Sequence, residues 1–247
     1  MKVTICPSRE AAGEEAAREG SARIREALAT RGEAGIIIAS GASQLDMLSN
    51  LVKAEGVGWH DVTGFHLDEY VGLPIEDRAS FRLYMWQRFV RALPLPLRAF
   101  HYIDAERDPA RECQRLGALL EGRTIDVAFV GIGENGHLAF NDPPADFHAR
   151  EAYLVVTLSE ASRRQQVGEG WFESLADVPR QAISMAVPQI MNAAAIVCCA
   201  PDLRKAAAVQ AVVEGPVTPA VPASILQRHP QATIYLDPAS ASRLSAC

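Results

Sequence analysis

Short, continuously apolar runs constrain the fold of this chain more than any other feature of its sequence. Residues 35–39 read Gly-Ile-Ile-Ile-Ala, and residues 125–131 read Ile-Asp-Val-Ala-Phe-Val-Gly. A strand with one face in water alternates apolar and polar residues, whereas a strand covered on both faces is apolar almost throughout. Because sheets covered on both faces are mostly parallel and flanked by helices, these runs predict a parallel sheet at the centre of the protein.

Longer segments with a helical pattern separate the strand-like runs. We expect helices over residues 9–31, 44–55, 81–92, 109–120 and 203–213. We expect strands over residues 3–6, 35–39, 62–67, 100–103, 125–131, 152–158, 194–199 and 232–236. This alternation predicts an α/β protein with a mostly parallel, Rossmann-like open sheet and helices on both faces. No repeat or linker interrupts the pattern, so we expect residues 1–247 to form a single domain.

Charge and composition argue against several classes of function. The 247 residues carry 24 basic and 30 acidic side chains, a net charge of −6, which argues against a nucleic-acid-binding surface. No apolar stretch is long enough to span a membrane, and the amino terminus lacks a signal-peptide core, so we expect a cytoplasmic protein without membrane partners. We expect the five cysteines to be structural or incidental, and no metal or cofactor, because the six histidines show no ligand spacing.

The loop after residues 35–39 is the first candidate for a ligand site, because ligands of open parallel sheets bind beyond the carboxyl ends of the strands. Residues 40–44 read Ser-Gly-Ala-Ser-Gln, at the start of an expected helix. Free backbone N–H groups and the helix dipole suit such a loop to a phosphate, held by Gly41, Ala42 and Ser43. The alternative is a tight turn in which Ser43 only caps the helix. The loop matches neither a P-loop nor a dinucleotide fingerprint.

Two further strand ends carry side chains suited to proton transfer. Asp68 and Glu69 follow the strand expected over 62–67; adjacent carboxylates suit general acid–base chemistry, and a solvated pair in a loop is the alternative. The glycine-rich loop over 131–144 follows the next apolar strand and brings a histidine, two amides and a carboxylate together. A histidine among hydrogen-bonding partners can move protons near neutral pH. The candidates in this loop are Asn135, Gly136, His137 and Asp142.

Lys205 and His66 extend this set of strand-end residues. Only three of the 24 basic residues are lysines, and Lys205 lies in the first turn of an expected helix, where the helix dipole disfavours a cation. A bound anion would remove that conflict. His66 lies two residues before Asp68, so strand alternation puts both side chains on one face, where His66 either lines the pocket or packs in the core.

Taken together, these segments resemble the glucosamine-6-phosphate deaminase family, in order and over nearly the whole chain. The matching motifs are Ser-Gly-Ala-Ser at 40–43, Leu-Asp-Glu-Tyr-Val-Gly-Leu-Pro at 67–74, Gly-Glu-Asn-Gly-His-Leu-Ala-Phe-Asn-Asp-Pro at 133–143, and Lys205 with Ala206. The same superfamily contains 6-phosphogluconolactonases, which share the Gly-His loop but differ around residues 67–74. The resemblance implies that D-glucosamine 6-phosphate and water are converted to D-fructose 6-phosphate and ammonia.

The resemblance also implies a role for each matched residue. Asp68 would be the base that moves a proton from C2 to C1 of the sugar, and His137 would open the sugar ring. Asp142, where the family often has Glu, would orient His137, and Asn135 stands where many members have Asp. The substrate would be held by Gly41, Ala42, Ser43 and Lys205 at its phosphate, with Glu69 and Gly136 as further contacts.

Two departures from the family pattern qualify this implication. A phosphate-binding arginine is expected a few residues after position 158, where the alignment needs an insertion and Gly168 or Glu169 falls near the slot. Arg163 or Arg164 is the candidate replacement. The loop after Pro143 lacks the serine, arginine and lysine set of allosterically activated members, so we expect no activation by N-acetylglucosamine 6-phosphate.

Two other functions stay open on the sequence. One is another reaction on the same scaffold, such as lactone hydrolysis or isomerisation of a different sugar phosphate; lactone hydrolysis needs no carbon base. The other is a non-catalytic sugar-phosphate sensor, which keeps the binding loop without the chemistry. The residues do not distinguish glucosamine 6-phosphate from its galactosamine epimer, nor a monomer from a homo-oligomer.

Overall fold

The computed structural model describes residues 1–245, and its central element is a seven-stranded sheet. The strand order is β1-β10-β9-β6-β2-β3-β5, and every neighbouring pair is parallel. The prediction of a mostly parallel α/β sheet is therefore confirmed. The strands are β1 (Lys2–Ile5), β2 (Ala34–Ile38), β3 (Val62–His66), β5 (Ala99–His101), β6 (Val127–Gly131), β9 (Ala195–Cys199) and β10 (Ala232–Leu236).

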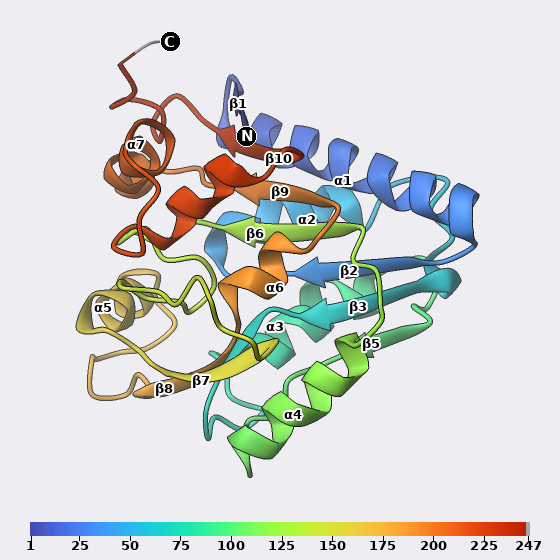
Figure 1. The fold of residues 1–247 in the computed structure, drawn as a ribbon, viewed down its shortest axis with the longest axis horizontal. Coiled ribbons are helices and arrows are strands. Elements are labelled where there is room, and N and C mark those ends of the chain that lie inside the picture. The colour runs from blue at the N-terminus through green and yellow to red at the C-terminus, as the bar shows by residue number, and fades with distance from the viewer. Residues whose placement is uncertain (246–247) are drawn as a thin grey trace.

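Helices cover both faces of this sheet, as the apolar runs predict (Figure 1). One face packs against α1 (Arg9–Arg31), α2 (Leu45–Leu51) and α3 (Phe81–Arg88), and the other against α4 (Pro109–Leu120), α6 (Val187–Met191) and α7 (Ala206–Glu214). Alternate residues of β2 explain the continuous apolar run. Ile36 and Ile38 pack in the cluster that includes α1, whereas Ile37 packs in the cluster that includes α4, and all three are fully buried.

Local signals set the ends of the two longest helices at their predicted positions. The Ser8 hydroxyl accepts a hydrogen bond from the Ala11 N–H at the start of α1, and Gly32 ends that helix in the left-handed conformation. The Asp108 side chain caps α4, and Pro109 takes its first position. Other predicted helices are shorter or begin and end in 3-10 turns, namely η1 (Ala42–Gln44) before α2, η3 (Val90–Ala92) after α3 and η4 (Leu203–Lys205) before α7.

A second sheet, which the sequence pattern does not predict, is antiparallel and lies to one side of the central sheet (Figure 1). Its strands, in order, are β4 (Asp68–Tyr70), β8 (Gln181–Met185) and β7 (Tyr153–Thr157), so the strand expected over 152–158 belongs here. Helix α5 (Glu160–Gly168) follows β7. Tyr153, Ile183 and Met185 pack in the same buried cluster as residues of β6 and β9.

The strand order of the central sheet reverses between β2 and β6. From β2 the chain continues outward through β3 to β5, whereas β6 lies on the other side of β2 and leads to β9 and β10. The loops after β2 and β6 therefore run in opposite directions and leave a crevice at the carboxyl ends of the strands. The crevice is the place where this class of fold binds ligands.

Two expectations from composition concern the described residues. Cys6, Cys113, Cys198 and Cys199 form no disulfide, and Cys247 lies outside residues 1–245. Over the same residues, no helix combines the length and the apolarity needed to cross a bilayer.

Candidate active site

A cavity opens at the crevice between β2 and β6. Its wall contains the loop after β2, the residues that follow β3 and β6, part of α5, and Lys205, which directly precedes α7. These five segments, which are far apart in the sequence, therefore meet, as expected at the carboxyl edge of one sheet. The predicted site residues in this wall are Gly41, Ala42, Ser43, Asp68, His137 and Lys205.

The loop after β2 is held by its own backbone conformation and by two side chains from neighbouring helices. Gly41 has a φ of 105°, which favours glycine. The Tyr84 hydroxyl donates a hydrogen bond to the Gly41 carbonyl at 2.9 Å, and Arg9 Nη2 donates to the Ala42 carbonyl at 2.5 Å. The predicted anion-binding loop is thus anchored from behind, on the side of α1 and α3.

Ser43 is not a helix cap, so that alternative is wrong. In η1 and α2 no side chain caps the first turn, and Ser43 Oγ instead accepts a hydrogen bond from Gln44 Nε2 at 3.0 Å. Gln44, which the sequence pattern does not single out, is fully buried. Its Nε2 also lies 3.3 Å from the Val130 carbonyl and 3.4 Å from the Cys199 carbonyl, so one amide ties the loop to the ends of β6 and β9.

Asp68 lies where the chain passes from the central sheet into the small sheet, and it is almost completely buried in the cavity wall. Burial, and next the negative charge of Glu69, raise the pKa of Asp68 to about 8. Near pH 7 this carboxyl is therefore mainly protonated unless a cation lies beside it. A carboxyl with this pKa is suited to exchange protons with a ligand near neutral pH.

The small sheet links Asp68 to the loop that carries His137. Asp68 pairs with Ser184 across the β4–β8 ladder. Ser184 Oγ accepts hydrogen bonds from the Phe140 N–H at 3.0 Å and from Asn141 Nδ2 at 3.3 Å. Asn141 Nδ2 also donates to the Met185 carbonyl at 2.8 Å. The loop after β6 is therefore attached to the strand that pairs with the strand of Asp68.

His137 is held in one tautomer by a chain of hydrogen bonds. Its Nδ1 lies 2.8 Å from Ser162 Oγ and 3.4 Å from Asp142 Oδ1. Because the Ser162 hydroxyl donates its only proton to Asp142, it accepts from Nδ1–H of His137. In the neutral ring, Nε2 is then the unprotonated nitrogen and can accept a proton. Asn135 Oδ1 accepts from the His137 backbone N–H at 3.1 Å.

Asp142 and Asn135 lie behind His137, outside the cavity wall. Burial alone would raise the pKa of Asp142, but the hydrogen bond and charge of His137 and the hydrogen bonds from Ser162 and Asn135 outweigh burial and hold that pKa well below its usual range. The prediction that Asp142 orients His137 agrees with this arrangement. Ser162 is a member that the sequence pattern misses, because α5 was not predicted.

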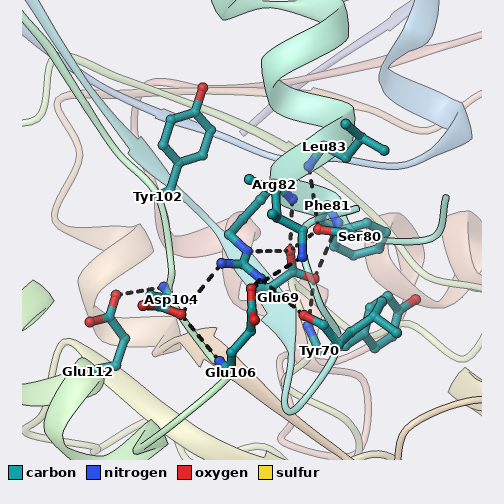
Figure 2. Close-up of polar contacts among 12 residues, drawn as sticks. Glu69, Tyr70, Ser80, Phe81, Arg82, Leu83, Tyr102, Asp104, Glu106 and Glu112 are labelled. Carbon is teal, nitrogen blue, oxygen red and sulfur yellow. Dashed lines mark hydrogen bonds and ion pairs between the residues drawn. The ribbon is translucent and has the colours of Figure 1, made fainter. Parts of the chain in front are cut away.

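Glu69 does not contact the cavity, so its assignment as a substrate contact is wrong. Strand alternation gives the reason, because neighbouring residues on β4 point to opposite faces and Asp68 takes the cavity side. Figure 2 shows the buried Glu69 carboxylate at the start of α3. It accepts hydrogen bonds from the backbone N–H groups of Tyr70, Phe81 and Arg82 and from the Ser80 hydroxyl.

Arg82 completes this buried ionic cluster on the far side of β4 (Figure 2). Its Nε lies 3.6 Å from Glu69, its Nη2 2.6 Å from Glu106 and its Nη1 3.5 Å from Asp104. Arg82 and Glu69 are both buried and therefore poorly hydrated. Their opposite charges partly compensate each other in place of water. The cluster fixes the position of α3 relative to β4.

We expect Glu69→Gln to lower the free energy of unfolding by about 3–5 kcal/mol, the usual cost of removing one partner of a buried ion pair. The amide would place N–H groups against donors that now face a carboxylate. Urea denaturation at neutral pH measures the change. A matched control is Glu121→Gln, at the exposed end of α4, for which no change is expected. A loss below about 1 kcal/mol for Glu69→Gln would contradict the structural role.

Two other predicted residues also lie outside the cavity wall. Gly136, expected to contact substrate, belongs to the turn before His137, and its carbonyl accepts from the Ala223 N–H at 2.9 Å. His66 is fully buried, and neither ring nitrogen has a hydrogen-bond partner among the described residues. Burial, and next the charge of Arg82, lower the pKa of His66 to about 3. Of its two alternatives, packing in the core is therefore confirmed.

Comparison with known proteins supports the resemblance on which these roles rest. The family model of glucosamine-6-phosphate isomerases/6-phosphogluconolactonase matches residues 7–235. The chain belongs to this family. A relative named glucosamine-6-phosphate deaminase from Lactobacillus delbrueckii subsp. bulgaricus is 34% identical over 246 residues, which cover 99% of this chain and 100% of the relative. One with the same name from Streptococcus pyogenes is 35% identical, over 90% of this chain and 92% of the relative.

Solved structures within the glucosamine-6-phosphate isomerase/6-phosphogluconolactonase family confirm the fold. The structure of a monomeric glucosamine-6-phosphate deaminase superposes with a TM-score of 0.89 at 30% identity, covering 98% of this chain and 99% of that one. A 6-phosphogluconolactonase from Trypanosoma brucei superposes with a TM-score of 0.80 at 16% identity, covering 99% and 98% of the two chains. At 16% identity, the similarity to the Trypanosoma brucei protein supports the fold alone.

In this member of the glucosamine-6-phosphate isomerase/6-phosphogluconolactonase family, neither candidate arginine reaches the cavity, so that prediction is wrong. Arg163 donates to the backbone carbonyls of Leu175 and Val178 and thereby holds the segment between α5 and β8. Arg164 is exposed and pairs with Glu160 one turn earlier on α5, at 2.5 Å. Both guanidinium groups are therefore committed outside the cavity wall.

The cavity receives polar and acidic side chains from this region instead: Gln165, Gln166 and Glu169. Glu169 Oε1 lies 3.9 Å from Lys205 Nζ, and both side chains are buried. Burial lowers the pKa of Lys205, and the charge of Glu169 opposes that shift. The alignment places Glu169 near the position expected for the arginine. Its pairing with Lys205 was not predictable from the sequence, because the pair depends on where α5 ends in the fold.

Proposed function

We propose that this chain is a glucosamine-6-phosphate deaminase, converting D-glucosamine 6-phosphate and water to D-fructose 6-phosphate and ammonia. The observation that carries the proposal is the presence of Asp68 and His137 in the wall of one cavity, together with the loop after β2 and Lys205. Relatives with this name at 34–35% identity over nearly the whole chain support it. We also propose that residues 1–247 form one domain, because the two sheets share one buried core.

The reaction assigns separate proton transfers to the two residues. His137 Nε2, left unprotonated by the hydrogen bond at Nδ1, takes the proton of the sugar C1 hydroxyl as the ring opens and returns it to the ring oxygen. Asp68 then takes the proton from C2 of the open aldose and delivers it to C1, while one proton of the C2 ammonium group moves to the C1 oxygen. These transfers leave a hydroxyl at C1 and a protonated imine at C2. Water attacks that imine and ammonia departs, so fructose 6-phosphate is the product.

Binding of the amino sugar would itself convert Asp68 to the ionised form that can act as a base. The amine on C2 is cationic near neutral pH, and a cation beside a buried carboxyl lowers the pKa of that carboxyl. A group whose pKa is raised to about 8 by burial and Glu69 therefore becomes the ionised base when the amino sugar binds. A sugar phosphate without the amine would lack this effect, which favours an amino sugar over a lactone as the substrate.

A coupled assay decides between the candidate reactions. We expect the purified protein to release ammonia from D-glucosamine 6-phosphate and to form D-fructose 6-phosphate in equal amounts. Hydrolysis of 6-phosphogluconolactone without release of ammonia would favour the lactonase alternative. Binding of both phosphorylated sugars without turnover of either would favour the sensor. The same assay with galactosamine 6-phosphate tests the epimer, and the expectation of no activation by N-acetylglucosamine 6-phosphate stays a prediction.

A further inference from the structure

The cavity contains an ion pair between Lys205, the expected phosphate contact, and Glu169, a carboxylate to which the proposed reaction gives no role. Lys205 is the only lysine or arginine among the wall residues that the structure describes, and Glu169 is 3.9 Å from its ammonium nitrogen. Both side chains are at least nine-tenths buried. Any anionic group that binds beside Lys205 must therefore share this cation with a carboxylate that belongs to the protein.

The Glu169 carboxylate is fixed in place. Gln165 Nε2 donates to its Oε1 at 2.8 Å, and Trp171 Nε1 donates to its Oε2 at 3.2 Å. Gln165 is itself held, since its Oε1 accepts from the Glu134 N–H at 2.8 Å. Glu169 also follows the last residue of α5, where the helix dipole disfavours a negative charge. A carboxylate that is held in an unfavourable position beside a ligand cavity points to a role toward the ligand.

We propose that Glu169 determines specificity, making the part of the cavity beside Lys205 a subsite for a group with one negative charge and not two. A ligand group with one negative charge can pair with Lys205 beside Glu169. A second negative charge on that group would be repelled by Glu169, and the described wall holds no further lysine or arginine to pair with it. The shared ligand chemistry is a monoanionic ester on the amino sugar. Two sources supply it, a sulfate ester at any pH and a phosphate ester below its second pKa of about 6.

The neighbouring charges do not remove this selectivity. Arg204 is partly exposed and pairs with Asp202 at 3.1 Å and with Glu134 at 3.7 Å, so it is already neutralised by two carboxylates. The other groups that face Glu169 are the phenols of Tyr70 and Tyr84, and burial raises the pKa of both, so they stay neutral. The charged groups around the pair are thus Lys205, Arg204, Glu134, Glu169 and Asp202, with a net charge of −1.

The test compares two non-reacting ligands, the 6-phosphate and the 6-sulfate of 2-amino-2-deoxy-D-glucitol, which lack a carbonyl at C1. Binding is measured by calorimetry between about pH 5 and about pH 8, a range in which the phosphate passes from mainly one charge to two. The quantity of interest is the affinity for phosphate relative to sulfate. The ionisation of Asp68 and His137 affects both ligands alike and cancels in this ratio.

We expect the ratio for the wild-type protein to fall by about 10- to 100-fold across this range, following the fraction of singly charged phosphate. In Glu169→Gln, which keeps an acceptor and the size of the side chain, the ratio is expected to change by less than about threefold. The control Glu160→Gln removes an exposed carboxylate from the same helix and should follow the wild type. Thermal denaturation verifies that each variant is folded.

The outcomes separate this inference from the function on which it rests. A ratio that falls equally in the wild type and in Glu169→Gln, or in neither, overturns the role of Glu169. A ratio that behaves as expected while D-glucosamine 6-phosphate releases no ammonia supports the subsite and contradicts the deaminase proposal. Failure of both esters to bind contradicts both proposals, whereas failure of the sulfate alone contradicts only the subsite.

Discussion

Replacement of Asp68 by Asn is expected to lower kcat for ammonia release by about 10²–10⁴-fold, the contribution of a general base placed at the reacting atoms. Asparagine keeps the size of the side chain, but it cannot take the proton from C2. Steady-state assays with D-glucosamine 6-phosphate measure the loss. Full activity of Asp68→Asn would show that the carbon base is another residue and would remove the main argument against a lactonase.

A stability measurement on the same variant tests whether this loss is caused by unfolding. The folded protein keeps the Asp68 proton up to about pH 8, whereas the unfolded chain loses it near the ordinary value of 3.8. Stability therefore decreases as pH rises through this interval, because the buried group must ionise. Asp68→Asn removes that effect, so its melting temperature at pH 8 is expected to equal or exceed that of the wild type. The control Asp146→Asn, in an exposed loop, should change neither activity nor stability.

Replacement of Gly133 by Ala is expected to lower kcat by about 100-fold, the size of effect that a displacement of about 1 Å produces in an aligned site. A Cβ at this position would lie 2.1 Å from Nε2 and 2.2 Å from Cε1 of His137. The ring cannot stay there, yet its Nδ1 is held by Ser162. The methyl group therefore disturbs the nitrogen that we expect to move the proton in ring opening.

Gly117→Ala is the matched control for this variant. It lies within α4, where a Cβ would meet only Ala152 at 4.0 Å, and alanine favours a helix more than glycine does. We expect Gly117→Ala to retain full activity with equal or greater stability. If Gly133→Ala also keeps full activity while folded, the ring position in the structure is not the one used in the reaction.

The central sheet was predictable because its strands are buried on both faces. Ile36, Ile37 and Ile38 leave no alternative to a strand between two helical layers. The small sheet and α5 were not predictable by the same means. The buried residues of α5 are Gln165 and Gln166, which line the polar cavity, and Ser162, which contacts His137 and Asp142. The helix therefore has no apolar stripe to reveal it. Strand β8 is short, and its pairing with β4 joins segments more than a hundred residues apart.

Which residues belong to the site was easier to predict from the sequence than which way their side chains point. The strand-end rule and the family motifs bring Asp68, His137 and Lys205 to one place. They do not tell which of two adjacent acidic residues faces the cavity, and Glu69 is the one that holds α3. Similarly, an arginine near the right position in the sequence is not in the site when the helix turns it outward, as Arg164 shows.

The attachment of the His137 loop to β8 has a consequence for how proteins with this architecture tolerate changes of chain length. The spacing between Asp68 and His137 is set by the pairing of Asp68 with Ser184 and by the hydrogen bonds of Ser184 to the loop. An inserted residue within β8 would shift that register and move one group relative to the other. Residues 173–177, which precede β8 and lie outside the cavity wall, contribute neither pairing, so insertions and deletions can accumulate there while Asp68 and His137 stay aligned.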